Sequence, residues 1–334
     1  MYNTLKTLIS IPSISGREEK IMAKIAEILA PLTDEVKIDN MGNVIAVKYG
    51  NGEKADKKKV MLCGHADEIG FLVTFIEESG MLRIAPVGGI NFVASAFTEV
   101  VSEKGVAGLL APNSGTKPED YRPDAFYIDI GAKSKKDAEK KVAIGDFFVC
   151  RPTLTRLMNG RICGRPFDDK IGCAIVIDIA RHFAENAPKD DIYFVCSVQE
   201  EVGCRGAKTA AYAIMPDYAL VYDVTGTGDT PGAKPMAVKV GGGAAIKIKD
   251  SSVICHTEVV EKLHELAKEN KITHQTEILL YGGTDTSSIQ MTGTGAKAGA
   301  LSIPSRYIHS GVELIDMKDV KACADLSIKF IESL

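Results

Sequence analysis

The sequence contains no tryptophan and no long apolar run, and both absences narrow the functions open to it. The chain has no indole ring to stack on the sugar rings of a polysaccharide. No window approaches the roughly 20 apolar residues that a membrane span needs. Residues 1–10 also lack the basic start and the apolar run of a signal peptide, so we expect neither membrane insertion nor export.

Positive charge is not in excess either. The 40 Lys and Arg residues are outnumbered by 44 Asp and Glu residues, which gives a net charge of −4. Such a chain offers no basic surface of the kind that binds nucleic acid or anionic lipid. Its 45% apolar and 25% charged residues, over 334 positions, are typical of a soluble globular protein with one large domain or two smaller ones.

The cysteines form no C-x-x-C pair, which argues against a zinc knuckle or a redox motif. Most of them stand inside apolar runs. We therefore expect buried, reduced thiols rather than disulfides, and a reducing, cytoplasmic location. The eight positions are Cys63, Cys150, Cys163, Cys173, Cys196, Cys204, Cys255 and Cys323.

Three short apolar runs, each typical of a strand buried on both faces, lead directly into histidine or carboxylate side chains. The runs are residues 60–63, 192–196 and 218–222, and the side chains that follow them are His65, Glu200, Glu201 and Asp223. In an open α/β sheet, ligands bind beyond the carboxyl ends of the strands. Each signal is weak alone, because a glutamate pair is usually a surface feature and a strand histidine is often satisfied within a core.

Two further residues join this set. Asp168 stands at the start of an amphipathic helix, where the helix dipole alone can explain an acid, and His309 stands in a late loop. Two imidazoles and three carboxylates without a thiol suit zinc, cobalt or manganese. Five ligands are too many for one open catalytic site but suffice for two ions if one carboxylate bridges them. Glu200 can then move a proton, provided that the strand end bends, since extended neighbours point to opposite faces.

Residues 69–163 have a different sequence pattern from the α/β segments on either side. Short strand-like runs alternate there with glycine-containing turns, and the segment has no histidine and no tight cluster of acids. We expect a β-rich insertion that serves assembly or substrate access rather than a second active site. Capping-box spacing predicts two helices, one beginning at Ser15 with Glu18 and a short one at Ser134.

Six motifs occur in a fixed order along almost the whole chain. They are HADEIGF from His65, FDDKIG from Phe167, SVQEEVGCRGA from Ser197, VYDVT from Val221, GGTDTS from Gly282 and RYIHS from Arg306. In this order they closely resemble the TET-type aminopeptidases, a family of glutamyl, leucyl and lysyl aminopeptidases in which some members are labelled endoglucanases. Ala66, Lys170 and Cys204 depart from the commonest family pattern, but none of them replaces a ligand.

The resemblance implies two divalent metal ions per subunit, zinc or cobalt, with manganese as a further option. By match to the family motifs, His65, Asp168 and Asp223 would bind one ion. Asp168, Glu201 and His309 would bind the other, so that Asp168 bridges the pair.

Catalytic roles are implied for Glu200, as general base, and for Asp67, which would orient His65. Two other residues keep alternative roles. Asp285 is a candidate substrate-binding residue, and a turn-capping role explains it equally well. Arg306 is able to pair with an internal acid or with a substrate group.

For the fold, the resemblance implies a three-layer α/β/α zinc-exopeptidase domain over residues 1–68 and 164–334. The insertion at residues 69–163 would be a β-rich, PDZ-like domain that supports dimers and, through them, a hollow tetrahedral dodecamer. The wider clan of two-zinc exopeptidases often has a cis peptide bond after the bridging acid, which predicts one between Asp168 and Asp169.

The leading hypothesis is a metal-dependent aminopeptidase that removes N-terminal residues from short peptides. An endoglucanase-type glycoside hydrolase is the first alternative, although it would need two carboxylates without metal participation. A metal-stabilised shell protein without enzymatic activity is the second. The preferred N-terminal side chain of the substrate cannot be predicted from the motifs.

Overall fold

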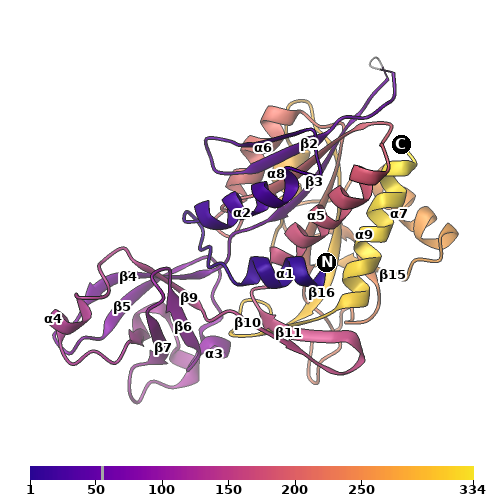
Figure 1. The fold of residues 1–334 in the computed structure, drawn as a ribbon. Helices are drawn as coiled ribbons and strands as arrows, with labels where there is room; N and C mark the ends of the chain where they lie inside the picture. Colours follow the sequence, from indigo (N-terminus) through magenta and orange to yellow (C-terminus); the bar gives the residue numbers. More distant parts are fainter. Residues whose placement is uncertain (54–55) are drawn as a thin grey trace.

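The computed structural model describes residues 1–53 and 56–334, and it has a mixed α/β fold with two sheets (Figure 1). The larger sheet contains eleven strands, nine of them in the spatial order β1-β2-β12-β3-β13-β16-β17-β11-β10, while β14 pairs with β15 and β16. Their bounds are β1 Glu35–Ile38, β2 Val44–Lys48, β3 Lys59–His65, β10 Thr153–Arg156, β11 Arg161–Arg165, β12 Asp191–Ser197, β13 Tyr218–Thr225, β14 Ala244–Lys249, β15 His274–Ile278, β16 Lys297–Arg306 and β17 Glu313–Asp316.

The centre of this sheet is parallel and buried. Strands β12, β3, β13 and β16 run parallel to one another, and every residue of β13 is buried. Parallel strands covered on both faces read as continuous apolar runs rather than as alternating patterns. The three apolar runs in the sequence therefore predicted three neighbouring strands correctly.

Helices cover both faces of the larger sheet (Figure 1). Successive side chains of a strand point to opposite faces, so Leu62 of β3 packs in one core while its neighbours Met61 and Cys63 pack in the other. The first core is closed by α1 Tyr2–Ile9, α2 Glu19–Leu29, α5 Lys170–Glu185, α7 Thr257–Glu269 and α9 Met317–Glu332, and the second by α6 Arg205–Ile214 and α8 Thr286–Gln290.

The second sheet is a closed barrel that lies to one side of the larger sheet, at the lower left of Figure 1. Its strand order is β4-β5-β8-β7-β6-β9, and phenylalanines such as Phe71, Phe126 and Phe148 fill its interior. Its elements are β4 Gly70–Ile76, β5 Leu82–Val87, α3 Phe92–Ser95, β6 Glu99–Ser102, β7 Ala107–Pro112, β8 Phe126–Asp129, α4 Lys135–Ala138 and β9 Phe147–Cys150, with 3-10 turns at Pro118–Asp120 and Pro123–Ala125.

The division of the chain into domains at residues 69 and 163 stays a prediction. Strands β10 and β11 precede residue 164 but pair within the larger sheet, where β11 joins β17. The last barrel strand ends at Cys150. We therefore propose that the second boundary lies between Cys150 and Thr153.

The predicted start of α4 at Ser134 is correct, the predicted start of α2 at Ser15 lies three residues too early, and neither helix has the predicted side-chain capping bond. The helix α2 begins at Glu19, with Glu18 as its N-cap residue and no side-chain capping bond. Ser15 donates instead to Asp67, and Glu18 accepts from the backbone of Gln199. Ser134 precedes α4 but likewise makes no side-chain capping bond. The Ser15–Glu18 spacing that resembled a capping box serves tertiary contacts.

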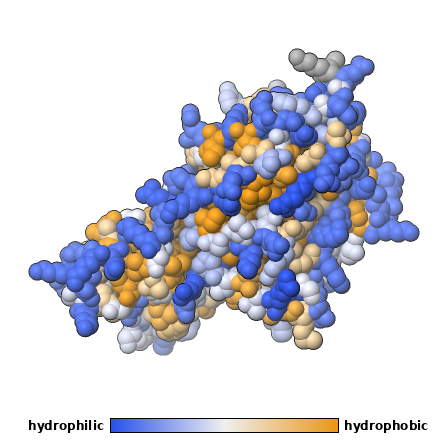
Figure 2. Space-filling view, in the orientation of Figure 1, coloured by the Kyte–Doolittle hydropathy of each residue, from blue (hydrophilic) through white to orange (hydrophobic). Residues whose placement is uncertain are grey.

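Hydrophobic residues also reach the surface of the barrel (Figure 2). The large exposed ones in this region are Phe75, Val93, Phe97, Leu109 and Ile144. Within residues 1–53 and 56–334, no helix combines the length and the apolar character needed to cross a membrane.

Candidate metal centre

The carboxyl ends of three adjacent strands bring the candidate ligands together. His65 is the last residue of β3 and pairs with Ser197, the last residue of β12. Asp223 lies near the end of β13, the neighbour of β3 on the other side. Because the strands are parallel, their ends meet at one edge of the sheet, where the side chains of three distant sequence segments converge.

Asp168 stands between the two histidines. His65 Nε2 lies 3.1 Å from Asp168 Oδ1 and 3.9 Å from Asp223 Oδ1. On the other side, His309 Nε2 lies 3.2 Å from Asp168 Oδ2 and 3.4 Å from Glu201 Oε2. The two oxygens of one carboxylate therefore face two different histidines. This produces two three-residue groups whose ligand atoms lie within 4.8 Å of one another, with Asp168 common to both.

The chain turns sharply after β12, so Glu200 and Glu201 do not continue an extended strand. The strand ends at Ser197, and Gln199 adopts a left-handed backbone with φ of 55°. As a result Glu200 Oε2 comes within 3.9 Å of His65 Nε2, while Glu201 faces His309. This is the bend that both glutamates needed in order to face one centre.

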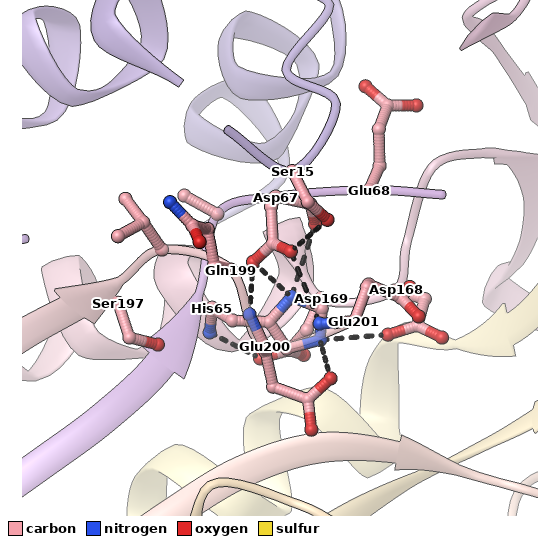
Figure 3. A network of polar contacts seen from close by, with 12 residues as sticks. Ser15, His65, Asp67, Glu68, Asp168, Asp169, Ser197, Gln199, Glu200 and Glu201 are labelled. Carbon is pink, nitrogen blue, oxygen red and sulfur yellow. Dashed lines mark hydrogen bonds and ion pairs between the residues drawn. The ribbon is translucent and has the colours of Figure 1, made fainter. Parts of the chain in front are cut away.

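Asp67 holds this turn in place (Figure 3). Its Oδ1 accepts from the backbone N–H of Glu200 at 3.0 Å, and its Oδ2 accepts from the backbone N–H of Glu201 at 3.2 Å. The same carboxylate lies 3.3 Å from His65 Nδ1 and accepts from Ser15 Oγ at 2.7 Å. One buried residue thus orients the imidazole, through its backbone carbonyl 3.1 Å from Nδ1 as well as its carboxylate, and fixes both glutamates.

The two imidazoles are surrounded by carboxylates that favour their protonated forms. Burial lowers the pKa of the His65 imidazole, but hydrogen bonds with Asp168 and Asp67 outweigh burial and raise that pKa well above its usual range. Burial likewise opposes the shift at His309, where Asp168 and Glu201 together raise the pKa to about 11. The site as a whole therefore attracts positive charge.

Burial and the excess of carboxylates also raise the pKa values of three of the carboxylates themselves. Burial, reinforced by Asp168, raises the pKa of Asp223 well above its usual range and also raises that of Glu201. Burial is the main cause at Glu200 too, where the raised pKa persists although His65 opposes it. Carboxylates outnumber the imidazoles, and like charges this close cannot all ionise without a cation between them.

This donor set fits divalent cations. It offers imidazole nitrogens and carboxylate oxygens without sulfur in the two groups that share Asp168, a mixture suited to zinc, cobalt or manganese. In addition, Glu201 Oε1 is buried and has no hydrogen-bond partner among the described residues. A buried carboxylate oxygen without a partner is costly, and a bound cation would satisfy it.

Sequence patterns missed two residues that position Asp168. Glu313 accepts from the backbone N–H of Phe167 at 2.5 Å and of Asp168 at 3.3 Å. Arg165 is buried, lies 3.9 Å from Glu313 and donates to the backbone carbonyl of Ser310 in the His309 loop. Glu313 is the first residue of the short strand β17, in which two of the four residues are acidic, so the local pattern carried no signal for it. The peptide bond between Asp168 and Asp169 is cis, which confirms that prediction.

A cavity of about 910 Å³ opens in front of the site. The candidate ligands Asp168, Glu201, Asp223 and His309 lie in its wall together with Glu200, and the segment 281–283 lines it as well. A space of this size, lined by convergent polar groups, is typical of a small-molecule or peptide site.

Two candidate residues take structural partners. Asp285 is only 2% exposed, makes no helix-capping bond at α8 and accepts from Ser197 Oγ at 2.5 Å. The turn-capping interpretation of Asp285 is therefore wrong. Arg306 donates to both oxygens of Asp229, at 3.0 Å and 2.7 Å, so it pairs with an internal acid.

Comparison with known proteins decides the family. The family model for M42 glutamyl aminopeptidase matches residues 42–326. The chain belongs to the M42 aminopeptidase family. A putative aminopeptidase of Acetivibrio thermocellus is 44% identical over 334 residues, which cover 99% of this chain and 98% of that protein. The TET-type resemblance seen in the motifs is thereby confirmed.

Solved structures share the fold of this M42 chain. An aminopeptidase from the archaeon Desulfurococcus kamchatkensis superposes with a TM-score of 0.94 at 34% identity, over 99% of this chain and 94% of that one. A Pyrococcus horikoshii TET1 peptidase that can assemble into a tetrahedron or a large octahedral shell gives a TM-score of 0.88 at 31% identity, over 100% and 99% of the two chains. One similar Thermotoga maritima structure is named an endoglucanase, with a TM-score of 0.82 at 31% identity over 98% and 96%.

M42 membership makes the protein a peptide hydrolase of the exopeptidase class. It favours the leading hypothesis over a shell protein without activity.

Proposed function

We propose that this M42 aminopeptidase removes N-terminal residues from short peptides by hydrolysis at a site with two divalent cations. His65, Asp168 and Asp223 would hold one cation, and Asp168, Glu201 and His309 the other. When bound, such a pair polarises the scissile carbonyl and lowers the pKa of the attacking water. The observation that carries the proposal is the pair of ligand groups that share Asp168.

Glu200 is the proposed general base. Its Oε2 lies 3.9 Å from His65 Nε2, at the edge of the cation groups without belonging to either of the two that share Asp168. Burial raises its pKa, a direction that brings a carboxylate closer to the value suited to proton transfer near neutral pH. Glu200 accepts a proton from the attacking water and returns it to the leaving amine. Asp67 holds the backbone of Glu200 and orients His65 while this occurs.

Zinc or cobalt is the proposed ion, and manganese is compatible with the same ligands. Nitrogen and oxygen donors do not separate these three ions by type. Reconstitution of the metal-free protein with each ion, followed by an assay on a panel of aminoacyl substrates, identifies the active form. The same panel identifies the preferred N-terminal side chain and tests whether Asp285 affects substrate binding.

The larger sheet with its helices is the proposed three-layer α/β/α exopeptidase domain. The barrel is the proposed PDZ-like insertion, with self-association through it into dimers and a tetrahedral dodecamer. Two observations support this assembly: the TET1 peptidase of P. horikoshii forms shells, and large hydrophobic side chains are exposed on the barrel. We also propose a cytoplasmic location, because all eight cysteines are free thiols.

The proposal is tested by Glu200→Gln, which preserves size and removes the base. We expect turnover of an aminoacyl-paranitroanilide to fall by on the order of 10²–10⁴-fold, while the cation content measured by elemental analysis stays at two per subunit. The matched control is Glu27→Gln on the exposed face of α2, which should retain full turnover. Full turnover of Glu200→Gln with both cations bound would contradict the role of Glu200.

The endoglucanase alternative is separated from this proposal by substrate and chelator. Glycoside hydrolysis proceeds on two carboxylates without a metal, so it would survive chelation. We expect the aminoacyl substrate to be cleaved only before chelation and cellulose not to be cleaved at all. Cellulose cleavage that resists a chelator would overturn the peptidase proposal.

A further inference from the structure

A third group of potential ligands lies beside the two that share Asp168. It consists of Glu200, Cys204 and Asp285, whose ligand atoms lie within 4.8 Å of one another. Cys204 Sγ is 3.3 Å from Glu200 Oε1. Unlike the other two groups, this one contains a sulfur atom and no histidine. Its chemistry therefore favours a different class of cation.

Glu200 faces this group and the cation centre at the same time. Its Oε2 is the oxygen nearest His65, at 3.9 Å, whereas its Oε1 accepts from the Cys204 thiol. Each oxygen of the carboxylate thus has a separate neighbour. A cation bound to Oε1 would neutralise the negative charge of Glu200. The proposed reaction uses that charge to accept a proton.

Asp285 supplies the observation that points to a ligand. Its side chain is 2% exposed, and its Oδ2 accepts from Ser197 Oγ at 2.5 Å. Its Oδ1 is buried and has no hydrogen-bond partner within the described ranges. Buried polar atoms are nearly always satisfied, so an orphaned carboxylate oxygen in a group of ligands calls for an ion or a donor.

The backbone holds Cys204 toward the cavity. Cys204 has a left-handed conformation with φ of 52° just before α6, and its backbone N–H donates to the carbonyl of Glu200 at 2.9 Å. The residue is half-buried and lines the 910 Å³ cavity together with Glu200. An ion in the cavity can therefore reach the sulfur without unfolding the turn.

We propose that Glu200, Cys204 and Asp285 form a third, inhibitory cation site for a thiophilic divalent ion such as Cd²⁺ or excess Zn²⁺. Binding replaces the thiol proton, which leaves to solvent, so that one thiolate and two carboxylates face one dication without a change of oxidation state. Thiolate ligands select soft ions. The binding step stands by itself, whereas the inhibition rests on the proposed role of Glu200 as the base.

Selectivity distinguishes this site from the pair that shares Asp168. Mg²⁺ prefers six oxygen ligands and avoids sulfur, so it should neither bind here nor inhibit. Cd²⁺ binding to a thiolate produces a sulfur-to-metal absorption in the ultraviolet that nitrogen and oxygen ligands do not give. That absorption reports occupation of the third site independently of catalysis.

The experiment adds Cd²⁺ to enzyme already carrying its two activating cations. Binding is measured by equilibrium dialysis and by the thiolate absorption. Inhibition is measured as the Cd²⁺ concentration that halves the activity of each variant relative to the same variant without Cd²⁺, so differences in basal activity cancel. We expect Cys204→Ser and Cys204→Ala to lose the absorption and to raise the half-inhibitory Cd²⁺ concentration by at least about tenfold. Cys163→Ser is the matched control, because Cys163 is the other cysteine that is not fully buried.

Each outcome decides the proposal. Absorption and inhibition that survive in both Cys204 variants, or that disappear equally in Cys163→Ser, would overturn it. In the wild-type enzyme, Cd²⁺ should also slow alkylation of Cys204 by iodoacetamide over the same concentration range, as read by mass spectrometry. Unchanged alkylation would count against the site even if a variant failed to fold. If Cd²⁺ binds with the absorption that depends on Cys204 but without inhibition, the cation site stands, its inhibitory role is overturned, and the role of Glu200 as base is contradicted.

Discussion

The barrel and the larger sheet bury different kinds of side chain. Within residues 70–150, the buried polar side chains are Ser95 and Ser102, and neither is charged. The rest of the described chain buries many ionisable groups, among them Asp168, Lys170 and Glu313. Most of those that surround the cavity lie at or beyond the carboxyl ends of the parallel strands.

This difference separates two sources of stability. An apolar core such as the barrel interior gains free energy from burial without a charge to desolvate. The end of the larger sheet gathers charges whose desolvation is unfavourable unless partners or cations compensate it. The barrel should therefore be indifferent to cations, and the site should depend on them.

The largest predicted difference between the larger sheet and the barrel comes from Asp168→Asn, which weakens the candidate ligand common to both groups. We expect turnover to fall by at least the order of 10²–10⁴-fold associated with loss of a general acid–base group, with loss of bound cations. The same substitution in the barrel, Asp146→Asn, affects the pair with Lys104 and an acceptor of the Ala143 backbone N–H, and it should leave both properties unchanged. Equal effects of the two variants, measured by kcat and elemental analysis, would refute the contrast.

The converse test is Phe126→Ala inside the barrel. Phe126 is fully buried, and its ring packs 4.8 Å from Phe92 and 5.0 Å from Tyr121, centroid to centroid. The free energy of unfolding should fall by about 3–5 kcal/mol, measured by denaturant titration. The cation content of the folded variant should equal that of the wild type. Cation loss in parallel with the destabilisation would show that the two regions are not independent.

Chelation should destabilise one region and leave the other intact. A cation present at one hundred times its Kd stabilises the folded state by about 2.7 kcal/mol, and a chelator removes that contribution. Hydrogen exchange should then accelerate at the carboxyl ends of β3, β12 and β13, with no change in β4 to β9. A uniform acceleration over both sheets would contradict this prediction.

A smaller effect is the pH dependence of stability that a buried acid in the region of the larger sheet should produce. Burial raises the pKa of Asp319 in α9 to about 6, although N–H donors from Gly241 and Gly243 oppose the shift. An acid with a raised folded-state pKa contributes stability below its unfolded value, near 3.8, and loses that contribution as the pH rises through about 6. The wild type should therefore lose stability relative to Asp319→Asn between pH 4 and pH 7.

The matched variant for this pH test is Asp325→Asn, at an exposed acid on the same helix. It should show no such slope when melting temperatures are compared across the same pH range. A slope of opposite sign for Asp319→Asn would mean that the two backbone donors dominate over burial.

The sequence predicted the parts of this molecule that depend on local pattern. Continuous apolar runs identified β3, β12 and β13, because strands covered on both faces exclude polar residues. Placing those strands in parallel brought His65, Glu201 and Asp223 to one edge of the sheet, since the carboxyl ends then converge, whereas the division into two groups that share Asp168 came from the family resemblance.

Tertiary contacts could not be predicted in this way. Glu313 positions Asp168 from a strand about 145 residues away, and nothing in its local pattern distinguishes it from a surface acid. Ser15 and Glu18 had the spacing of a capping box, but Ser15 donates to Asp67, and Glu18 accepts from Gln199 in addition to its neighbour Gly16. The closure of the barrel was likewise not predictable, because short alternating strands do not specify which edges pair.

The carboxylate of Asp67 has a mechanical consequence. It binds the backbones of Glu200 and Glu201 and also contacts His65, so these three groups share one anchor and shift together. The distances among these three groups are then insensitive to bending of the domain. Bending moves the three groups as a unit and leaves the spacing between them unchanged. Adjustment to peptides of different shape falls to other parts of the cavity wall, where Tyr281 and the glycines at 282 and 283 are exposed.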